Sequence, residues 1–376
     1  MQIVEINSKK DLKKFAKFPI KFYKGNKYYV PPILMDEIGT FLPEKNPAFD
    51  YCRAKFWLVL DDGKIVGRIA GIINDRYIEK WKNKYARFGW VDFIDNPEVS
   101  GLLFKTVEDW AKSEGMEKIH GPLGFTDMDY EGMLIEGFEE LGTLATIYNY
   151  PYYPVHLEKF GYRKDTDWVE FEIKVPEKVP EIAEKISKLV QDRKKIRVFQ
   201  AKKVKDLLPY AHGLFKVLNA AFSGLYGFVE LTPKQIDKYV KQYFSFIKPN
   251  YIKLLLDEKD EVAGFLIAMP SLSRALQKSK GRLFPFGFIY LLRAMKKNNY
   301  IDLYLGAIRP DLQGKGADAL LITEITRTAI KNKIISAESN IELESNYLVL
   351  SHWKHFEHRQ HKRRRCYIKQ LTISNK

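Results

Sequence analysis

The chain has 376 residues, of which 45% are hydrophobic, 14% aromatic and 29% charged, so its composition is that of a globular protein and excludes a disordered one. Its only cysteines, Cys52 and Cys366, exclude a disulfide framework and a cysteine-rich metal site. Lysine and arginine outnumber the acids by 62 to 47, which gives a net charge of +15. This excess favours an anionic partner such as a phosphorylated cofactor, nucleic acid or an anionic lipid surface.

No uninterrupted apolar run approaches the roughly 18 residues that a membrane span requires. The N-terminal residues MQIVEINSKKDLKKF also lack the apolar core of a secretory signal. We therefore expect a cytoplasmic protein.

Two similar halves, joined by a charged helix, are predicted from the order of elements. Proline and charge patterning predict a linker helix over residues 176–195, which leaves an N-terminal domain over 1–175 and a C-terminal domain over 196–376. In the first half, apolar periodicity and turn signals define the elements. The predicted strands are 2–6, 56–60, 64–74, 89–95, 116–122, 143–150 and 167–175, and the predicted helices are 8–24, 97–114 and 152–162.

The second half repeats this order, with a basic aromatic insertion at 271–299. The predicted strands are 196–201, 251–257, 262–269, 300–308, 335–344 and 364–371, and the predicted helices are 204–221, 233–246, 317–331 and 347–358. Each half is thus predicted to be an α/β domain in which a mixed, mostly antiparallel sheet has a central parallel pair and is flanked by helices.

The segment IRPDLQGKGADA, residues 308–319, joins a predicted strand to a predicted helix. Gly314 and Gly316 let backbone N–H groups approach a ligand closely, and the N-terminus of a helix attracts anions. These features are typical of a pyrophosphate-binding turn. A plain strand-to-helix turn is the alternative interpretation.

This segment resembles the cofactor loop of the GNAT superfamily of acyl-coenzyme A-dependent N-acyltransferases, which reads Gln/Arg-x-x-Gly-x-Gly/Ala. Gln313 and Gly316 match the pattern, and Asp318 stands where its last small residue is expected. Downstream, Glu344-Ser345-Asn346 resembles the second motif of the family. Through its element order the whole chain resembles uncharacterised bacterial tandem GNAT-like proteins, with a degenerate first half that lacks a glycine loop.

The resemblance implies that acetyl-CoA or another acyl-CoA is the co-substrate and that an amine of a small molecule or a macromolecule attacks the thioester directly. The spacing of the histidines at 352, 355, 358 and 361 could suggest metal ligands, but no cysteine or clustered carboxylate joins them, so we expect no metal. The resemblance also implies a cofactor-binding site made of Ile308, Gln313, Gly314, Lys315, Gly316, Ala317 and Asn346. Three further residues are candidates for acid or base catalysis because they lie on the strands next to the thioester that the resemblance implies. They are Asp302, Tyr304 and Glu344.

Two departures from the family pattern leave another function open. Trp353 stands at the position of the usual tyrosine acid, and because an indole cannot supply a proton near neutral pH, its replacement by alanine should leave activity mostly intact. Asp318 brings a carboxylate to the place of a pyrophosphate. The alternative is a non-catalytic GNAT-like binding or scaffold protein for an anionic partner, whereas no recognised motif supports a nucleic-acid-binding protein.

The insertion at 271–299 carries lysine, arginine and aromatic residues but no acid. It is too short to span a bilayer, and three interpretations stay open: peripheral membrane contact through 283–295, a lid over an acyl chain, or packing on its own domain or on a second copy in a homo-oligomer. Phe284, Phe286 and Phe288 are the residues to test. The histidines at 352, 355, 358 and 361 are predicted to lie on one basic, exposed helix face.

Overall fold

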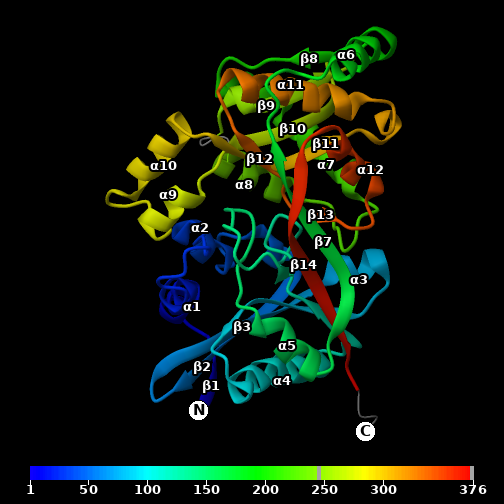
Figure 1. Ribbon diagram of the computed structural model, residues 1–376. Coiled ribbons are helices and arrows are strands. Elements are labelled where there is room, and N and C mark those ends of the chain that lie inside the picture. The colour runs from blue at the N-terminus through cyan, green and yellow to red at the C-terminus, as the bar shows by residue number, and fades with distance from the viewer. Residues whose placement is uncertain (244–246, 373–376) are drawn as a thin grey trace. The chain divides into compact units, whose positions relative to one another are not determined.

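A computed structural model of the chain describes residues 1–243 and 247–372 (Figure 1). The described chain separates into two compact units. The first unit contains Met1–Val169, Leu272–Leu292 and the chain from His361 onward, and the second contains Glu170–Ser271 and Arg293–Gln360. The predicted domain boundaries, with an N-terminal domain ending at residue 175 and a C-terminal domain starting at residue 196, stay a prediction.

In the first unit, helices cover both faces of a mixed sheet. Its helices are α1 (Lys9–Phe22), α2 (Leu34–Thr40), α3 (Asp75–Trp81), α4 (Pro97–Ser113), α5 (Tyr152–Lys159) and α9 (Ser273–Ser279), followed by α10 (Gly287–Lys296), which runs on into the second unit. Its strands are β1 (Gln2–Glu5), β2 (Cys52–Asp61), β3 (Lys64–Asn74), β4 (Tyr85–Phe93), β5 (Lys118–Gly121) and β6 (Met133–Glu136). Two more strands, β7 (Arg163–Lys174) and β14 (His358–Gln370), cross the unit boundary.

The sheet of the first unit runs in the order β1-β2-β3-β4-β5-β14, with β6 also paired to β14. All of these pairings are antiparallel except that of β4 with β5, which is parallel over Tyr85–Arg87 and Lys118–His120. Apolar side chains of α4 and α5 pack on one face of the sheet, and those of α1 and α2 pack on the other. The predicted central parallel pair is therefore present in the first unit.

The second unit repeats this plan. Its helices are α6 (Glu181–Lys194), α7 (Ala211–Phe222), α8 (Pro233–Tyr243), α11 (Ala317–Lys331) and α12 (Tyr347–Leu350), and its strands are β8 (Arg197–Phe199), β9 (Ile252–Leu256), β10 (Val262–Pro270), β11 (Tyr300–Ile308), β12 (Ser336–Glu338) and β13 (Glu342–Leu343). The sheet order is β8-β9-β10-β11-β12-β7, and β11 pairs in parallel with β12. The predicted mixed α/β architecture, with a parallel pair in each half, is confirmed.

The last strand of each half completes the sheet of the other half. Residues 367–370 of β14 pair with β5 in the first unit, and residues 172–174 of β7 pair with β12 in the second. Element order cannot reveal this exchange, because two similar halves offer each terminal strand two similar sheet edges.

Several predicted elements differ from the structure. Residues 143–150 form no strand, and the short strand β6 comes earlier in the chain. The helix predicted over 347–358 is only α12 followed by a 3-10 helix over Ser351–His355, after which β14 begins. The prediction that the four histidines share one exposed helix face was therefore wrong, since the side chain of His361 is only 4% exposed. The end of the helix predicted over 233–246 lies outside the described residues.

Candidate functional site

The turn between β11 and α11 is open on one side and packed on the other. Gly314 and Gly316 have φ angles of +66° and +86°, which favour glycine. A Cβ added to Gly314 would meet no atom within 4 Å, whereas one added to Gly316 would lie 2.8 Å from Cγ2 of Val190 on α6. A ligand can therefore approach the turn at Gly314, where the first N–H groups of α11 lack partners within the helix.

Hydrogen bonds within the turn fix its backbone. The Gln313 side-chain amide donates to the carbonyl of Ile308 at 3.0 Å, and Lys315 Nζ donates to the carbonyl of Asp311 at 2.6 Å. Ala317 is the first residue of α11 and is buried. The predicted cofactor residues from Ile308 to Ala317 thus form one continuous turn, while Asn346 caps the short helix α12.

The carboxylate of Asp318, in the first turn of α11, is paired with a histidine. His352 Nε2 lies 2.5 Å from Asp318 Oδ2, and this hydrogen bond lowers the pKa of Asp318 below its usual value. The ion pair with a protonated His352 would offset the negative charge near the turn.

A partly buried carboxyl group with a raised pKa lies in the same unit. Both carboxylate oxygens of Glu342, on β13, are 3.0 Å from the indole nitrogen of Trp353, which donates to them. Burial raises the pKa of Glu342 to about 8, and the indole N–H opposes that rise. A carboxyl group poised near neutral pH can take up and release a proton during a reaction.

The segment that leads to Glu342 is attached to β11 by a hydrogen bond from Asn340, beyond the point where the parallel strands stop pairing. The pairing of β11 with β12 covers residues 300–302 and 336–338. Beyond it, the side-chain amide of Asn340 donates to the carbonyl of Tyr304 at 2.9 Å. Two residues later the chain reaches Glu342, at the start of β13. The sequence prediction named Glu344 and not Glu342; the available signal was an acid between the apolar residues Ile341 and Leu343.

Two of the three candidate catalytic residues contact each other. The Tyr304 hydroxyl donates to Asp302 Oδ2 at 3.3 Å, and burial, reinforced by that carboxylate, raises the pKa of Tyr304 well above its usual value. Glu344 lies in the turn after β13. Their catalytic roles stay predictions.

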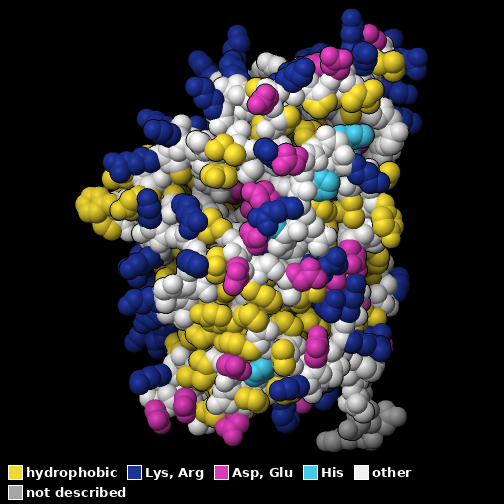
Figure 2. Space-filling view, viewed as in Figure 1, with side chains coloured by type: hydrophobic (Ala, Val, Ile, Leu, Met, Phe, Trp, Pro, Cys, Tyr) yellow, Lys and Arg dark blue, Asp and Glu magenta, His cyan; other side chains and the backbone are white. Residues whose placement is uncertain are grey.

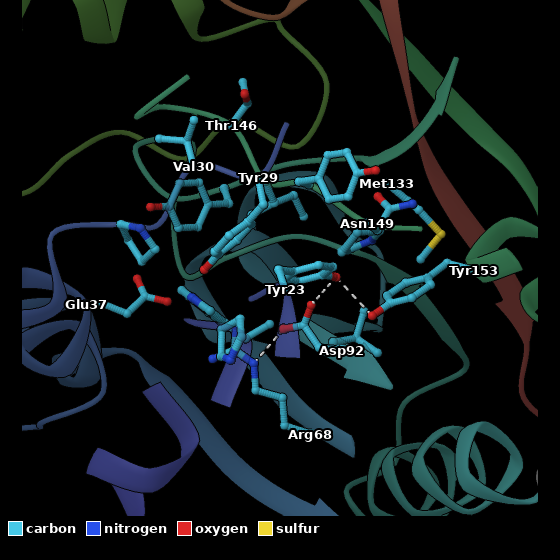
Figure 3. A pocket seen from close by; sticks show the side chains of 18 residues that line it. Tyr23, Tyr29, Val30, Glu37, Arg68, Asp92, Met133, Thr146, Asn149 and Tyr153 are labelled. Atoms are coloured by element: carbon cyan, nitrogen blue, oxygen red, sulfur yellow. Dashed lines mark hydrogen bonds and ion pairs between the residues drawn. The ribbon is translucent and has the colours of Figure 1, made fainter. Parts of the chain in front are cut away.

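A second candidate site is a polar cavity in the first unit (Figure 3). It has a volume of about 40 Å³, room for a few water molecules. Arg68 Nε and the Tyr23 hydroxyl each donate to Asp92 at 2.7 Å, and the hydroxyls of Tyr23 and Tyr153 lie 3.0 Å apart. Asp92 is on β4, past the end of its pairing with β5, so the cavity opens where the parallel strands diverge.

Glu37 adds a second carboxyl group to this cavity, which contains a single arginine. Glu37 is only 6% exposed. Burial raises the pKa of Glu37 to about 7, although the charge of Arg68 opposes the rise. The hydroxyl of Tyr29, also on the cavity wall, makes no hydrogen bond to any residue within 1–243 and 247–372. Neither feature was predicted, since both arise from residues far apart in sequence.

We expect Glu37→Gln to stabilise the protein at pH 8 by on the order of 3 kcal/mol, and by less at pH 5. The pKa of this carboxyl is higher in the folded than in the unfolded chain, so wild-type stability falls as the pH rises from about 4.5 to about 7. A glutamine cannot ionise and avoids that loss. Urea unfolding at the two pH values measures the difference.

Glu44→Gln is the matched control, because Glu44 is exposed and paired with Lys9, and that hydrogen bond lowers its pKa. It should bring no gain at pH 8. An equal gain in both variants would contradict the assignment to burial.

A Ser–His–Asp chain in the first unit is structural. Ser100 Oγ lies 2.7 Å from His156 Nδ1, and His156 Nε2 lies 2.9 Å from Asp95. Ser100 is fully buried on α4, where its hydroxyl also faces the carbonyls of Asn96 and Pro97 at 3.3 Å. A serine that no substrate can reach is not a nucleophile, so these residues hold α5 against the start of α4.

Comparisons with known proteins bear on the fold. No family model matches the chain. Protein YghO of Escherichia coli K12 is 27% identical over 371 residues, 97% of this chain and 94% of that protein. Bacterial ceramide synthase of Caulobacter vibrioides is 24% identical over 299 residues, 79% of this chain and 77% of that protein.

Among solved structures, a tandem GNAT protein from the clavulanic acid biosynthesis pathway matches with a TM-score of 0.53 and 12% identity, over 100% of this chain and 99% of that chain. The chain has a tandem GNAT-like fold. The β11–α11 turn lies in the second GNAT-like unit and the cavity around Asp92 in the first. Of the helices described in this tandem GNAT-like chain, none combines the length and apolar character that crossing a membrane requires.

Proposed function

We propose that the protein is an acyl-CoA-dependent N-acyltransferase whose donor binds at the β11–α11 turn. The observation that carries the proposal is the open glycine turn at the N-terminus of α11, together with the partly buried Glu342, whose pKa is raised, in the same unit. Backbone N–H groups at a helix start bind phosphate oxygens without requiring a lysine or arginine.

The residues of the turn fit a pyrophosphate. Gly314 leaves the approach open, Ala317 and Asp318 begin the helix, and the Asp318 carboxylate is hydrogen-bonded to His352. Lys315, an exposed residue whose amino group donates to the carbonyl of Asp311, adds a cation at the edge of the turn. The acceptor amine attacks the thioester carbonyl of acyl-CoA, so that a C–N bond replaces the C–S bond and CoA leaves as a thiolate. The proton that the amine loses balances the one that the thiolate takes up to become the free thiol.

Glu342 is the proposed base for that proton. Because its pKa is raised to about 8, the ionised form is basic enough to accept a proton and is still populated near neutral pH. Trp353 holds both carboxylate oxygens and therefore positions the base. In this proposal Trp353 positions the base, and it is not merely a substitute for the tyrosine acid of the family. Replacing Trp353 should therefore change the activity.

We propose a long-chain amine as the acceptor and a fatty acyl-CoA as the donor. A relative that is 24% identical is named bacterial ceramide synthase, and ceramides are amides of fatty acids with long-chain amino alcohols. The exposed aromatic segment of this chain, described below, is a surface suited to such water-insoluble substrates. A non-catalytic binding protein would bind no acyl-CoA at the turn.

The turn is tested by calorimetric titration with acetyl-CoA and with a long-chain acyl-CoA. We expect Gly314→Asp to weaken binding about tenfold or more, because it places a carboxylate beside the pyrophosphate in otherwise open space. Gly314→Asn is the matched control, since both side chains tolerate a positive φ and only one is charged. Unchanged binding in the Asp variant would contradict the assignment.

The same change at Gly316 would be ambiguous. A Cβ there would collide with Val190, so any loss of binding could reflect displacement of α6 rather than charge.

A further inference from the structure

The tip between α9 and α10 exposes large apolar side chains to solvent. Phe284 and Phe286 are 71% and 70% exposed, and Phe288, Tyr290 and Leu292 are exposed as well. Figure 2 shows hydrophobic side chains projecting at the edge of the molecule where α9 and α10 lie in Figure 1. Exposed apolar clusters of this kind mark interaction sites.

The base of this tip is firmly attached to the first unit. The backbone N–H of Leu34 donates to the carbonyl of Gly281 at 2.8 Å, and the side-chain amide of Gln277 donates to the carbonyls of Lys27 and Tyr29 at 2.9 and 3.0 Å. Leu276, on the inner side of α9, is fully buried. The inner side of α9 therefore packs on the first unit and holds the segment in place, while the phenylalanines of the tip project into solvent.

Cations flank the apolar tip on both sides in the sequence. Within residues 271–299 there is no acid, and the exposed cations are Arg274, Lys278, Lys280 and Arg282 before the tip and Arg293, Lys296 and Lys297 after it. Lys27, whose carbonyl contacts α9, is exposed too. The segment 271–299 thus combines exposed aromatic side chains with exposed cations and contains no acid.

We propose that this tip docks the protein on the surface of a bilayer that contains anionic lipids. Phenylalanines at the tip enter the boundary between headgroups and acyl chains, while the flanking lysines and arginines face lipid phosphates. The ten residues of α10 cannot cross the hydrocarbon core, so the contact is peripheral. Docking does not depend on the proposed transferase activity, although it would bring a water-insoluble amine within reach.

The experiment is flotation of the full chain with vesicles, in the absence of acyl-CoA. Vesicles of phosphatidylcholine alone are compared with vesicles in which about a third of the lipid is phosphatidylglycerol. We expect binding to the anionic vesicles that weakens as salt is raised, and little binding to the neutral ones. Phe284→Ser with Phe286→Ser should lower the partition coefficient about tenfold or more.

Two further double variants test whether vesicle binding requires this tip rather than any exposed apolar side chain, and whether the cations contribute to binding in addition to the phenylalanines. Ile182→Ser with Leu189→Ser is the matched control, since it removes two apolar side chains from α6 that are 57% and 48% exposed, and it should bind vesicles like the wild type. Lys278→Gln with Arg282→Gln should weaken binding to anionic vesicles. Unchanged melting temperatures confirm folding, as expected for exposed positions.

The proposal is overturned if the wild type does not float with anionic vesicles, if the phenylalanine variant floats like the wild type, or if the α6 control loses as much binding. Binding of single-stranded RNA that depends on the same phenylalanines, without vesicle binding, would reassign the tip to nucleic acid. Binding of acetyl-CoA is measured separately, by titration in solution without vesicles. A protein that does not bind vesicles can therefore be distinguished from one that does not bind the acyl donor.

Discussion

Glu342→Gln is expected to lower kcat by about 10²–10⁴-fold, the range in which a positioned base contributes to proton transfer. The substitution keeps the shape and the contact with Trp353 but removes the basic oxygen. The assay follows release of free thiol from a fatty acyl-CoA with a long-chain amino alcohol as acceptor. Binding of acyl-CoA, measured by calorimetry, should remain within a few-fold of wild type.

The pH dependence gives this prediction a second readout. The base must be ionised, so wild-type kcat/KM should rise with pH through an apparent pKa near 8, the value to which burial raises Glu342. Trp353→Phe removes the indole N–H that opposes this rise, and should therefore shift the profile to higher pH. A Glu342→Gln enzyme with wild-type kcat, or a Trp353→Phe profile that does not move, would contradict the assigned roles.

Arg68→Met is expected to destabilise the first unit by about 3–5 kcal/mol, the usual cost of leaving a buried charge without its partner. The Arg68 and Asp92 side chains are 6% and 8% exposed, and Arg68 also donates to the carbonyl of Phe15 at 2.9 Å. Its loss leaves the carboxyl groups of Asp92 and Glu37 in one small cavity without the arginine. The midpoint and slope of urea unfolding measure the change.

Arg53→Met provides the comparison, because Arg53 also contacts two acids, Asp75 and Glu114, but its side chain is 50% exposed. Water screens this pair, so the expected cost is about 1 kcal/mol or less. Equal losses in the two variants would show that burial does not set the strength of the Arg68 network.

The β11–α11 turn could be located from the sequence because its signals are local. Gly314 and Gly316 take positive φ angles, and α11 begins at Ala317, as a glycine turn ahead of a helix predicts. The parallel pair in each half also followed from element order and apolar periodicity.

The proposed base could not be located in this way. Glu342 and Glu344 are two residues apart and look alike in sequence, and the contact of Glu342 with Trp353, eleven residues further on, exists only in the folded chain. This contact forms because the chain turns back through a short 3-10 helix where periodicity predicted a longer α-helix. Burial, which sets the pKa, follows from this packing.

By itself the sequence determined the two-fold repetition of a mixed α/β plan and the place of its glycine turn, since caps, turns and apolar alternation act over a few residues. Only the tertiary structure decided that the terminal strands are exchanged between the sheets and that Leu272–Leu292 belongs to the first unit. It also placed the basic run Lys362–Arg365 in strand β14, where Arg363 and Arg365 pair with the buried Asp167. Pairing between distant segments depends on complementary edges and charges that meet only after folding, so no local pattern encodes it.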